Sequence, residues 1–295
     1  MDPEQQAAAG NGNITLVECP RDAMQGWPHF IDTDQKVRYL NALLQVGFDT
    51  LDFGSFVSAR AIPQMADTKS LVGRLDLSGS RTRLLAIVAN VRGAEEAAAY
   101  GAIHFLGFPF SISETFQQRN TNSSIEKSLK TVEAIQGLCA KWGKELVVYL
   151  SMGFGNPYGD PYSKTILLQW AKEISATGVG IISMADTVGL ATPEQVFENT
   201  SSLIDSLPDK QIGLHLHAKA ADWPQKVKAG LRAGCRRFDG ALLGIGGCPM
   251  AGDELVGNLN SSLLIPFFQG LGILGPINKE ALAESEAMAK KIFTV

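Results

Sequence analysis

Short runs of hydrophobic residues alternate with segments of helical periodicity along nearly the whole chain. The runs are continuously apolar rather than alternately apolar and polar, a pattern typical of parallel strands that are covered on both faces. We predict eight such strands, at residues 14–18, 50–53, 83–89, 103–107, 145–151, 180–184, 212–217 and 236–241.

The segments between these strands carry the signals of helices. Thr192, with Pro193 directly after it and Gln195 three residues later, predicts a capping box at a helix start. Ser123 with Glu126 predicts a second capping box. The chain therefore alternates between strands and helices from its first apolar run onward.

Eight β/α units within 295 residues favour a single α/β domain, a (β/α)8 TIM barrel. An open, doubly wound sheet is the alternative, but no glycine-rich nucleotide loop follows the first strand. We expect a disordered N-terminal tail over residues 1–13 and one barrel domain over residues 14–295. The domain should end in a C-terminal helical extension at residues 278–293.

The composition and charge of the chain limit the kinds of partner and the compartment that we expect. A net charge of -4 and a pI near 5.6 argue against nucleic acid as a general partner. No apolar run approaches the roughly 18 residues that a membrane-spanning helix needs, and the N-terminal residues lack the pattern of a signal or transit peptide. Four scattered cysteines without a CxxC pair suit a reducing compartment. We expect a cytoplasmic protein that binds neither nucleic acid nor membrane.

Polar residues stand where the predicted strands end, and a TIM barrel builds its active site at that end of the strands. His215 and His217 have the spacing of a strand, so both imidazoles face one side and form a plausible half of a divalent metal site. Further candidates follow the first, second, sixth and eighth strands, respectively Arg21 with Asp22, Asp52, Asp186 and Cys248.

Each of these elements also fits a purely structural role when it is taken alone. An Arg-Asp pair on a loop is commonly a turn salt bridge, and Asp186 with Thr187 fits turn or capping chemistry. A cysteine is commonly a small buried hydrophobe. Five such elements at the same end of one predicted barrel nevertheless favour a metal-assisted enzyme.

The residues at these strand ends also resemble a known family. The motifs are Pro20-Arg21-Asp22 with Gln25, Ser55-Phe56-Val57-Ser58, Pro63-Gln64-Met65, Asp186-Thr187 with Gly189, His215 with His217, and Gly246-Gly247-Cys248-Pro249. In this order and on these strands, they resemble 3-hydroxy-3-methylglutaryl-CoA lyase, one of the TIM-barrel metallolyases. The resemblance covers nearly the whole chain.

This resemblance implies a carbon–carbon lyase that cleaves 3-hydroxy-3-methylglutaryl-CoA to acetyl-CoA and acetoacetate, a step of leucine catabolism and ketone body formation. It implies that a divalent cation, Mg²⁺ or Mn²⁺, is held by Asp22, His215, His217 and Asn258.

The resemblance also implies the remaining roles. Arg21 would stabilise negative charge on the thioester oxygen, and Cys248 would protonate the enolate. Asp52 and Asp186 would be acid/base or orienting groups, whereas Asp22 and His215 are both candidates for the group that takes the hydroxyl proton. The partners implied are an acyl-CoA substrate and a second copy of the chain in a homodimer.

Several positions depart from the family pattern. Cys19 stands where the family has glycine, Asp52 where it has glutamate, and Val147 where it has an arginine on the fifth strand. The segment from Cys248 to Asn258 is one residue longer than expected, which bears on Asn258 as a ligand.

These departures leave two other functions open: a related lyase or aldolase for another 3-hydroxyacyl-CoA or a 2-oxo or hydroxy acid, and a non-catalytic barrel that binds metal or acyl-CoA. Arg119 and Asn120, after the fourth strand, are candidate CoA contacts or a solvated turn.

Overall fold

Eight parallel strands close into a barrel in the computed structural model, which describes residues 13–247 and 256–294. Neighbouring strands in the chain pair with each other, and the last strand pairs with the first. The strands are β1 Thr15–Glu18, β2 Thr50–Ser55, β3 Arg83–Ile87, β4 Ile103–Ser111, β5 Glu145–Ser151, β6 Ile181–Asp186, β7 Gln211–Leu216 and β8 Arg237–Gly240. The predicted TIM barrel is confirmed.

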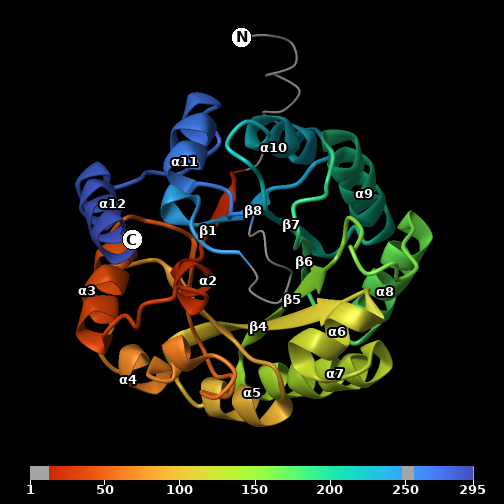
Figure 1. Ribbon diagram of the computed structural model, residues 1–295, viewed down its shortest axis with the longest axis horizontal. Coiled ribbons are helices and arrows are strands. Elements are labelled where there is room, and N and C mark those ends of the chain that lie inside the picture. The colour runs from red at the N-terminus through yellow and green to blue at the C-terminus, as the bar shows by residue number, and fades with distance from the viewer. Residues whose placement is uncertain (1–12, 248–255, 295) are drawn as a thin grey trace.

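Helices surround the barrel on its outside, except for the first one, which lies inside the ring of the others beside β1 (Figure 1). They are α2 Pro20–Gln25, α3 Thr33–Leu44, α4 Thr68–Val72, α5 Val91–Ala98, α6 Glu114–Thr121, α7 Ile125–Trp142, α8 Lys164–Ala176, α9 Pro193–Ser206, α10 Trp223–Arg232, α11 Ser261–Gly270 and α12 Lys279–Ile292. Short 3₁₀ turns occur at η1 Pro63–Met65 and η2 Leu242–Gly244. None of the helices in the described parts of the chain is long and apolar enough to cross a membrane.

The hydrophobic core has two parts, because alternate residues of a strand face opposite sides of the sheet. Outward-facing apolar residues pack against the surrounding helices and form the larger core. A smaller cluster is drawn from β3, β4, β5 and β6, and consists of Leu85, Ile87, Phe105, Val147, Tyr149 and Ile181. Filling a TIM barrel with side chains in this way gives a packed floor instead of a pore.

The helix starts agree with the sequence in one case and correct it in another. Thr192 and Gln195 form the predicted capping box at the start of α9. At α7 the prediction of Ser123 was wrong, because Ser124 is the capping residue and accepts a hydrogen bond from the backbone N–H of Lys127. Both serines precede an apolar helical pattern, so the pattern alone does not choose between them.

β4 continues four residues beyond the predicted end at residue 107, and it pairs with β5 as far as Ser111. Glycine and proline usually weaken a strand, yet Gly107 and Pro109 both lie within β4. Gly107 has a packing reason, since a Cβ there would lie 2.5 Å from the Cδ1 atom of Ile87.

The chain after β8 returns to β1 and to the outer helices. The buried carboxyl group of Glu18, at the end of β1, accepts hydrogen bonds from the Leu242 N–H at 2.8 Å and from the Ser261 hydroxyl at 2.5 Å. The predicted C-terminal extension is α12, capped by Asn278. It lies beside α3 (Figure 1), where the ring of Phe293 packs edge-on against Tyr39. Glu18 therefore ties the barrel to the segment that carries the last helices.

Candidate active site

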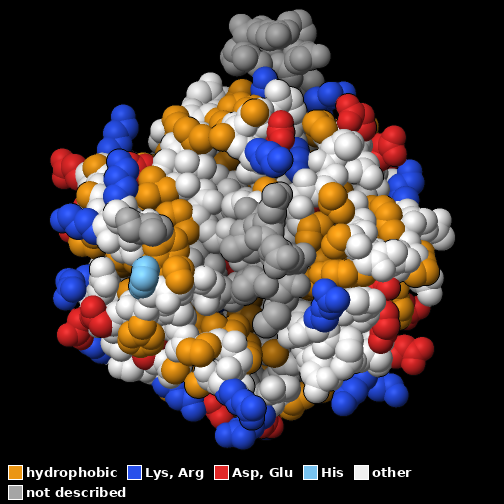
Figure 2. Space-filling view, in the orientation of Figure 1, with side chains coloured by type: hydrophobic (Ala, Val, Ile, Leu, Met, Phe, Trp, Pro, Cys, Tyr) orange, Lys and Arg blue, Asp and Glu red, His pale blue; other side chains and the backbone are white. Residues whose placement is uncertain are grey.

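A cavity of about 130 Å³ opens at the end of the barrel where the strands finish. Both polar and apolar side chains line it. They are Arg21, Asp22, Gln25, Val57, Ile62, Ile87, Ala89, Pro109, Phe116, Asn120, Tyr149, Ser151, Ala185, Thr187, His215 and His217. Figure 2 shows this face, on which most Lys, Arg, Asp and Glu side chains lie at the outer edge of the molecule. We refer to this space as the central cavity.

Asp22, His215 and His217 form a group of possible metal ligands in the central cavity. One ligand atom from each lies within 4.8 Å of the others. The Nε2 atoms of the two histidines are 3.3 Å apart, as expected for inward-facing residues two apart on a strand. Asp22 comes from a different part of the barrel. It lies on α2, which starts at Pro20 directly after the end of β1. The strand spacing therefore produces the convergence that the sequence predicted.

Asn258 lies against the same group. Its side-chain N–H donates to Asp22 Oδ2 at 2.7 Å and to the Ile245 carbonyl at 2.9 Å, and its backbone forms an isolated antiparallel bridge with His217. Gly246 has a φ of +108°, and a Cβ there would lie 2.5 Å from the amide nitrogen of Asn258 and 3.0 Å from Asp22 Oδ2. Only glycine leaves this cradle open at no steric cost.

Arg21 forms a network beside this group. Its Nη2 donates to Asp52 Oδ2 at 2.5 Å, and its Nη1 donates to Asp22 Oδ1 at 3.3 Å and to Gln25 Oε1 at 2.9 Å. Gln25 in turn donates to Asp22 at 2.7 Å. The helical spacing of residues 21, 22 and 25 makes these contacts possible. Asp52 is buried and does not line the central cavity, so it contacts the Arg21 guanidinium on the side that faces away from the cavity.

The charges of the group suit a cation. Burial opposes ionisation of Asp22, but Arg21 and the two histidines outweigh it and lower the pKa of that carboxyl. Burial also lowers the pKa of His217 to about 4, with a further contribution from His215. Burial raises the pKa of Asp52 to about 6, although Arg21 opposes this shift. At neutral pH Asp22 and His217 therefore present a carboxylate and a neutral imidazole, the forms that bind metals. Burial opposes protonation of His215, but its hydrogen bond to Asp239 and the charge of that residue raise its pKa.

Asp186 takes a different position from the one that the sequence suggested. It pairs with Leu216 of the neighbouring strand β7 but does not line the central cavity, whereas Ala185 and Thr187 on either side of it do. Its Oδ2 accepts a hydrogen bond from Lys226 Nζ at 2.8 Å, and the same ammonium donates to the His217 carbonyl at 2.9 Å. Among the described residues, the Lys226 side chain thus links the Asp186 carboxylate to the metal-ligand group.

Cys248 lies outside the described residues, and its predicted role stays a prediction. Sequence reasoning missed Lys226 and Asp239. Asp239, on β8, is buried, and its carboxylate lies 3.2 Å from His215 Nδ1. The alternation of β8 offered a signal, since Asp239 is the inward-facing neighbour of residue 237 on the same strand. No comparable signal pointed to Lys226, which belongs to a helix.

Comparison with known proteins gives the family. The model of the HMGL-like family matches residues 14–288. The chain belongs to the HMGL-like family. The chain is 31% identical over 278 residues to the cytoplasmic 3-hydroxy-3-methylglutaryl-CoA lyase of Rattus norvegicus. This alignment covers 92% of this chain and 80% of the relative. It is 33% identical over 279 residues to the (R)-citramalyl-CoA lyase of Chloroflexus aurantiacus, covering 91% and 87%.

A solved HMG-CoA lyase from Acinetobacter baumannii, in complex with coenzyme A and 3-methylmalate, has the same fold. Its TM-score is 0.88 at 26% identity, over 99% of this chain and 92% of that chain. The HMGL-like resemblance and the assignment to carbon–carbon lyases of acyl-CoA are therefore confirmed at the level of the family. The relatives include lyases named cytoplasmic and lyases named mitochondrial, so the compartment stays a prediction.

Proposed function

We propose that this HMGL-like protein is a divalent-metal-dependent lyase that cleaves 3-hydroxy-3-methylglutaryl-CoA to acetyl-CoA and acetoacetate. The observation that carries the proposal is the convergence of Asp22, His215 and His217 within 4.8 Å, with the Arg21 guanidinium 3.3 Å from Asp22. One cavity thus offers ligands for a cation and a fixed positive charge. Retro-aldol cleavage needs both, because negative charge develops first on the hydroxyl oxygen and then on the thioester oxygen.

Mg²⁺ or Mn²⁺ would be held by Asp22, His215, His217 and Asn258. Mixed oxygen and nitrogen donors suit these ions, whereas zinc usually takes thiolate ligands or three histidines at comparable sites. The Asn258 amide nitrogen is occupied by Asp22 and by the Ile245 carbonyl, which leaves its carbonyl oxygen as the atom for a cation. When bound, the cation supplies charge that orients the substrate's hydroxyl and carboxylate oxygens and lowers the hydroxyl pKa.

Arg21 would stabilise the enolate oxygen of the departing acetyl-CoA. Asp52 holds the guanidinium by contacts of 2.5 to 3.2 Å, so little reorganisation is needed as charge develops. Cys248, in the sequence Gly-Gly-Cys-Pro, would donate the proton to the enolate carbon. Asp22 and His215 both line the cavity beside the proposed cation and are the two candidates for the group that accepts the hydroxyl proton. His215 could accept it only at an Nε2 atom that the cation does not occupy.

Asp186 would act as a positioning residue. Its ion pair with Lys226 fixes the ammonium that donates to the His217 carbonyl, and both side chains are almost completely buried. The acyl-CoA would enter past Asn120, which lines the central cavity. Arg119, the neighbouring residue, lies with its guanidinium 4.6 Å from the ring centroid of Tyr158. A homodimer and a cytoplasmic location belong to the same proposal.

A second candidate is cleavage of citramalyl-CoA, which would give acetyl-CoA and pyruvate. The relative with this activity in its name is 33% identical to the chain. In addition, Arg21 is the only Lys or Arg among the described residues that line the central cavity, and residues 248–255 contain neither type. Val147, where the family has an arginine, is buried in the apolar cluster of the barrel floor. The cavity therefore provides one fixed guanidinium for either substrate.

Purified protein incubated with each acyl-CoA tests the proposal, with Mn²⁺ or Mg²⁺ present or removed by EDTA. Metal-dependent formation of acetoacetate from 3-hydroxy-3-methylglutaryl-CoA is expected, and pyruvate from citramalyl-CoA would support the second candidate instead. If neither product forms, a screen of other 3-hydroxyacyl-CoAs distinguishes a related lyase of different specificity from a non-catalytic barrel. Cys248→Ala should lower turnover with nearly unchanged Mn²⁺ affinity, whereas His217→Ala should lower both.

A further inference from the structure

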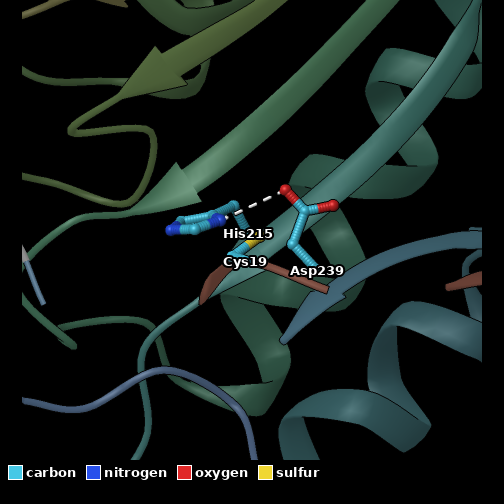
Figure 3. A group of neighbouring side chains, drawn as sticks. All are labelled: Cys19, His215 and Asp239. Atoms are coloured by element: carbon cyan, nitrogen blue, oxygen red, sulfur yellow. Dashed lines mark hydrogen bonds and ion pairs between the residues drawn. The ribbon is translucent and has the colours of Figure 1, made fainter. Parts of the chain in front are cut away.

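Asp239 lies directly behind one of the proposed metal ligands. The strand pairing of Gly213 with Arg237 on β7 and β8 places the next inward-facing residues, His215 and Asp239, beside each other. Figure 3 shows the Asp239 carboxylate turned toward the His215 ring, and its Oδ2 lies 3.2 Å from Nδ1. The Asp239 side chain is completely buried, and its other oxygen has no hydrogen-bond partner among the described residues.

The two nitrogens of His215 face two different groups. Nδ1 faces Asp239, and Nε2 lies 3.3 Å from His217 Nε2, in the group that includes Asp22. A neutral imidazole carries only one N–H. If that hydrogen is on Nδ1, it is donated to the carboxylate and the lone pair of Nε2 is free for a cation. If it is on Nε2, that nitrogen cannot bind a metal.

The surroundings leave Asp239 as the strong hydrogen-bond acceptor at Nδ1. Cys19 also lies in this group, with its sulfur within 4.8 Å of the ligand atoms of His215 and Asp239 (Figure 3), but a thiol is a weak hydrogen-bonding partner. The ring of Tyr149 meets the His215 ring edge-on at a centroid distance of 5.7 Å. The tyrosine therefore restrains the plane of the imidazole, while the carboxylate selects which nitrogen carries the hydrogen.

We propose that Asp239 is a positioning residue that holds His215 in the Nδ1–H tautomer and so presents the Nε2 lone pair to the divalent cation. The consequence for catalysis rests on the proposed function, but the tautomer does not. Carboxylates that orient metal-bound histidines in this way typically change metal affinity by about 10- to 100-fold when they are removed. Asp239 would belong to the site although it does not line the central cavity.

The tautomer can be measured directly in the metal-free protein. The chain has four histidines, so long-range ¹H–¹⁵N correlation spectra of histidine-labelled protein at alkaline pH separate His215 from His29, His104 and His217. The wild type should show the Nδ1–H form at His215. Asp239→Asn should lose this preference, because an amide can donate to Nδ1. An Nε2–H form in the wild type overturns the proposal, and this measurement does not depend on how any variant folds.

Mn²⁺ binding, followed by electron paramagnetic resonance of the free ion, is the second measurement. Asp239→Asn should weaken binding by about 10- to 100-fold, and Asp239→Glu should restore part of the loss. Ser183→Ala is the matched control, since Ser183 is also completely buried in a barrel strand but belongs to neither metal-ligand group. Unchanged Mn²⁺ affinity in Asp239→Asn, or an equal loss in Ser183→Ala, would contradict the proposal.

The two proposals can fail separately. If the wild type has the Nδ1–H tautomer and Asp239→Asn weakens Mn²⁺ binding, but no acyl-CoA is cleaved, the positioning role stands and the lyase function fails. If acetoacetate is formed with the Nε2–H form at His215, the lyase function stands and the role of Asp239 is refuted.

Discussion

Replacing Asp186 by asparagine tests whether this residue acts on the substrate or on the structure. The change removes the charge opposite the Lys226 ammonium, whose Nζ lies 2.8 Å from Asp186 Oδ2. The side chains of the two residues are only 5% and 1% exposed, so solvent does not screen the charge that remains. Removing one partner of such a buried pair typically lowers the free energy of unfolding by about 3–5 kcal/mol. We expect a loss of this size for Asp186→Asn.

The double variant Asp186→Asn/Lys226→Met sharpens the test. Removing both charges should be less costly than the sum of the two single changes, by roughly 2–3 kcal/mol, because neither charge is left alone in the interior. Some loss should remain, since the carbonyl oxygens of His217 and Gly189 also lose the ammonium. Urea unfolding followed by circular dichroism measures these free energies, and steady-state kinetics below the unfolding transition measures turnover.

A positioning role predicts that Asp186→Asn lowers kcat by less than about tenfold, whereas loss of a general acid or base typically costs about 10²- to 10⁴-fold. The reasoning would be refuted if the variant kept its free energy of unfolding within about 1 kcal/mol and lost activity on the second scale. Asp186 would then contact the substrate in a state of the protein that differs from this structure.

Three further predictions concern pH, charge and metal. Burial raises the pKa of Glu18 from 4.5 to about 8, so its contribution to stability is complete below about pH 4.5 and is lost as the pH rises through about 8. At about 1.4 kcal/mol per pKa unit, the loss is at most ~5 kcal/mol, and urea unfolding of Glu18→Gln should lack this slope. Arg21→Lys loses the two-nitrogen contact with Asp52 and should lower kcat by about 10²- to 10³-fold; an equal effect of the exposed Arg74→Lys in the same assay would contradict this. Saturating Mn²⁺ at about 100 times its Kd should stabilise the wild type by ~2.7 kcal/mol, and thermal melts of His217→Ala should not shift.

The fold could be predicted well because its signals are local. Continuous apolar runs located every strand, and the capping box at Thr192 located the start of α9. The site was predicted in part. Strand spacing brought His215 and His217 together, and the first helical turn after β1 brought Asp22 to them. Asn258 also lies against this group and donates a hydrogen bond to Asp22, despite the extra residue before it.

The sequence by itself determined the barrel and the set of residues at the ends of its strands, because apolar periodicity and chain order depend only on neighbours along the chain. Tertiary structure decided which of those residues face the cavity. Asp186 and His217 both stand at strand ends, yet Asp186 pairs with Lys226, forty positions further along the chain, while His217 faces the cavity. Strand register gave Asp239 its contact with His215. Such pairings depend on which elements the closed barrel places side by side, and no local pattern encodes them.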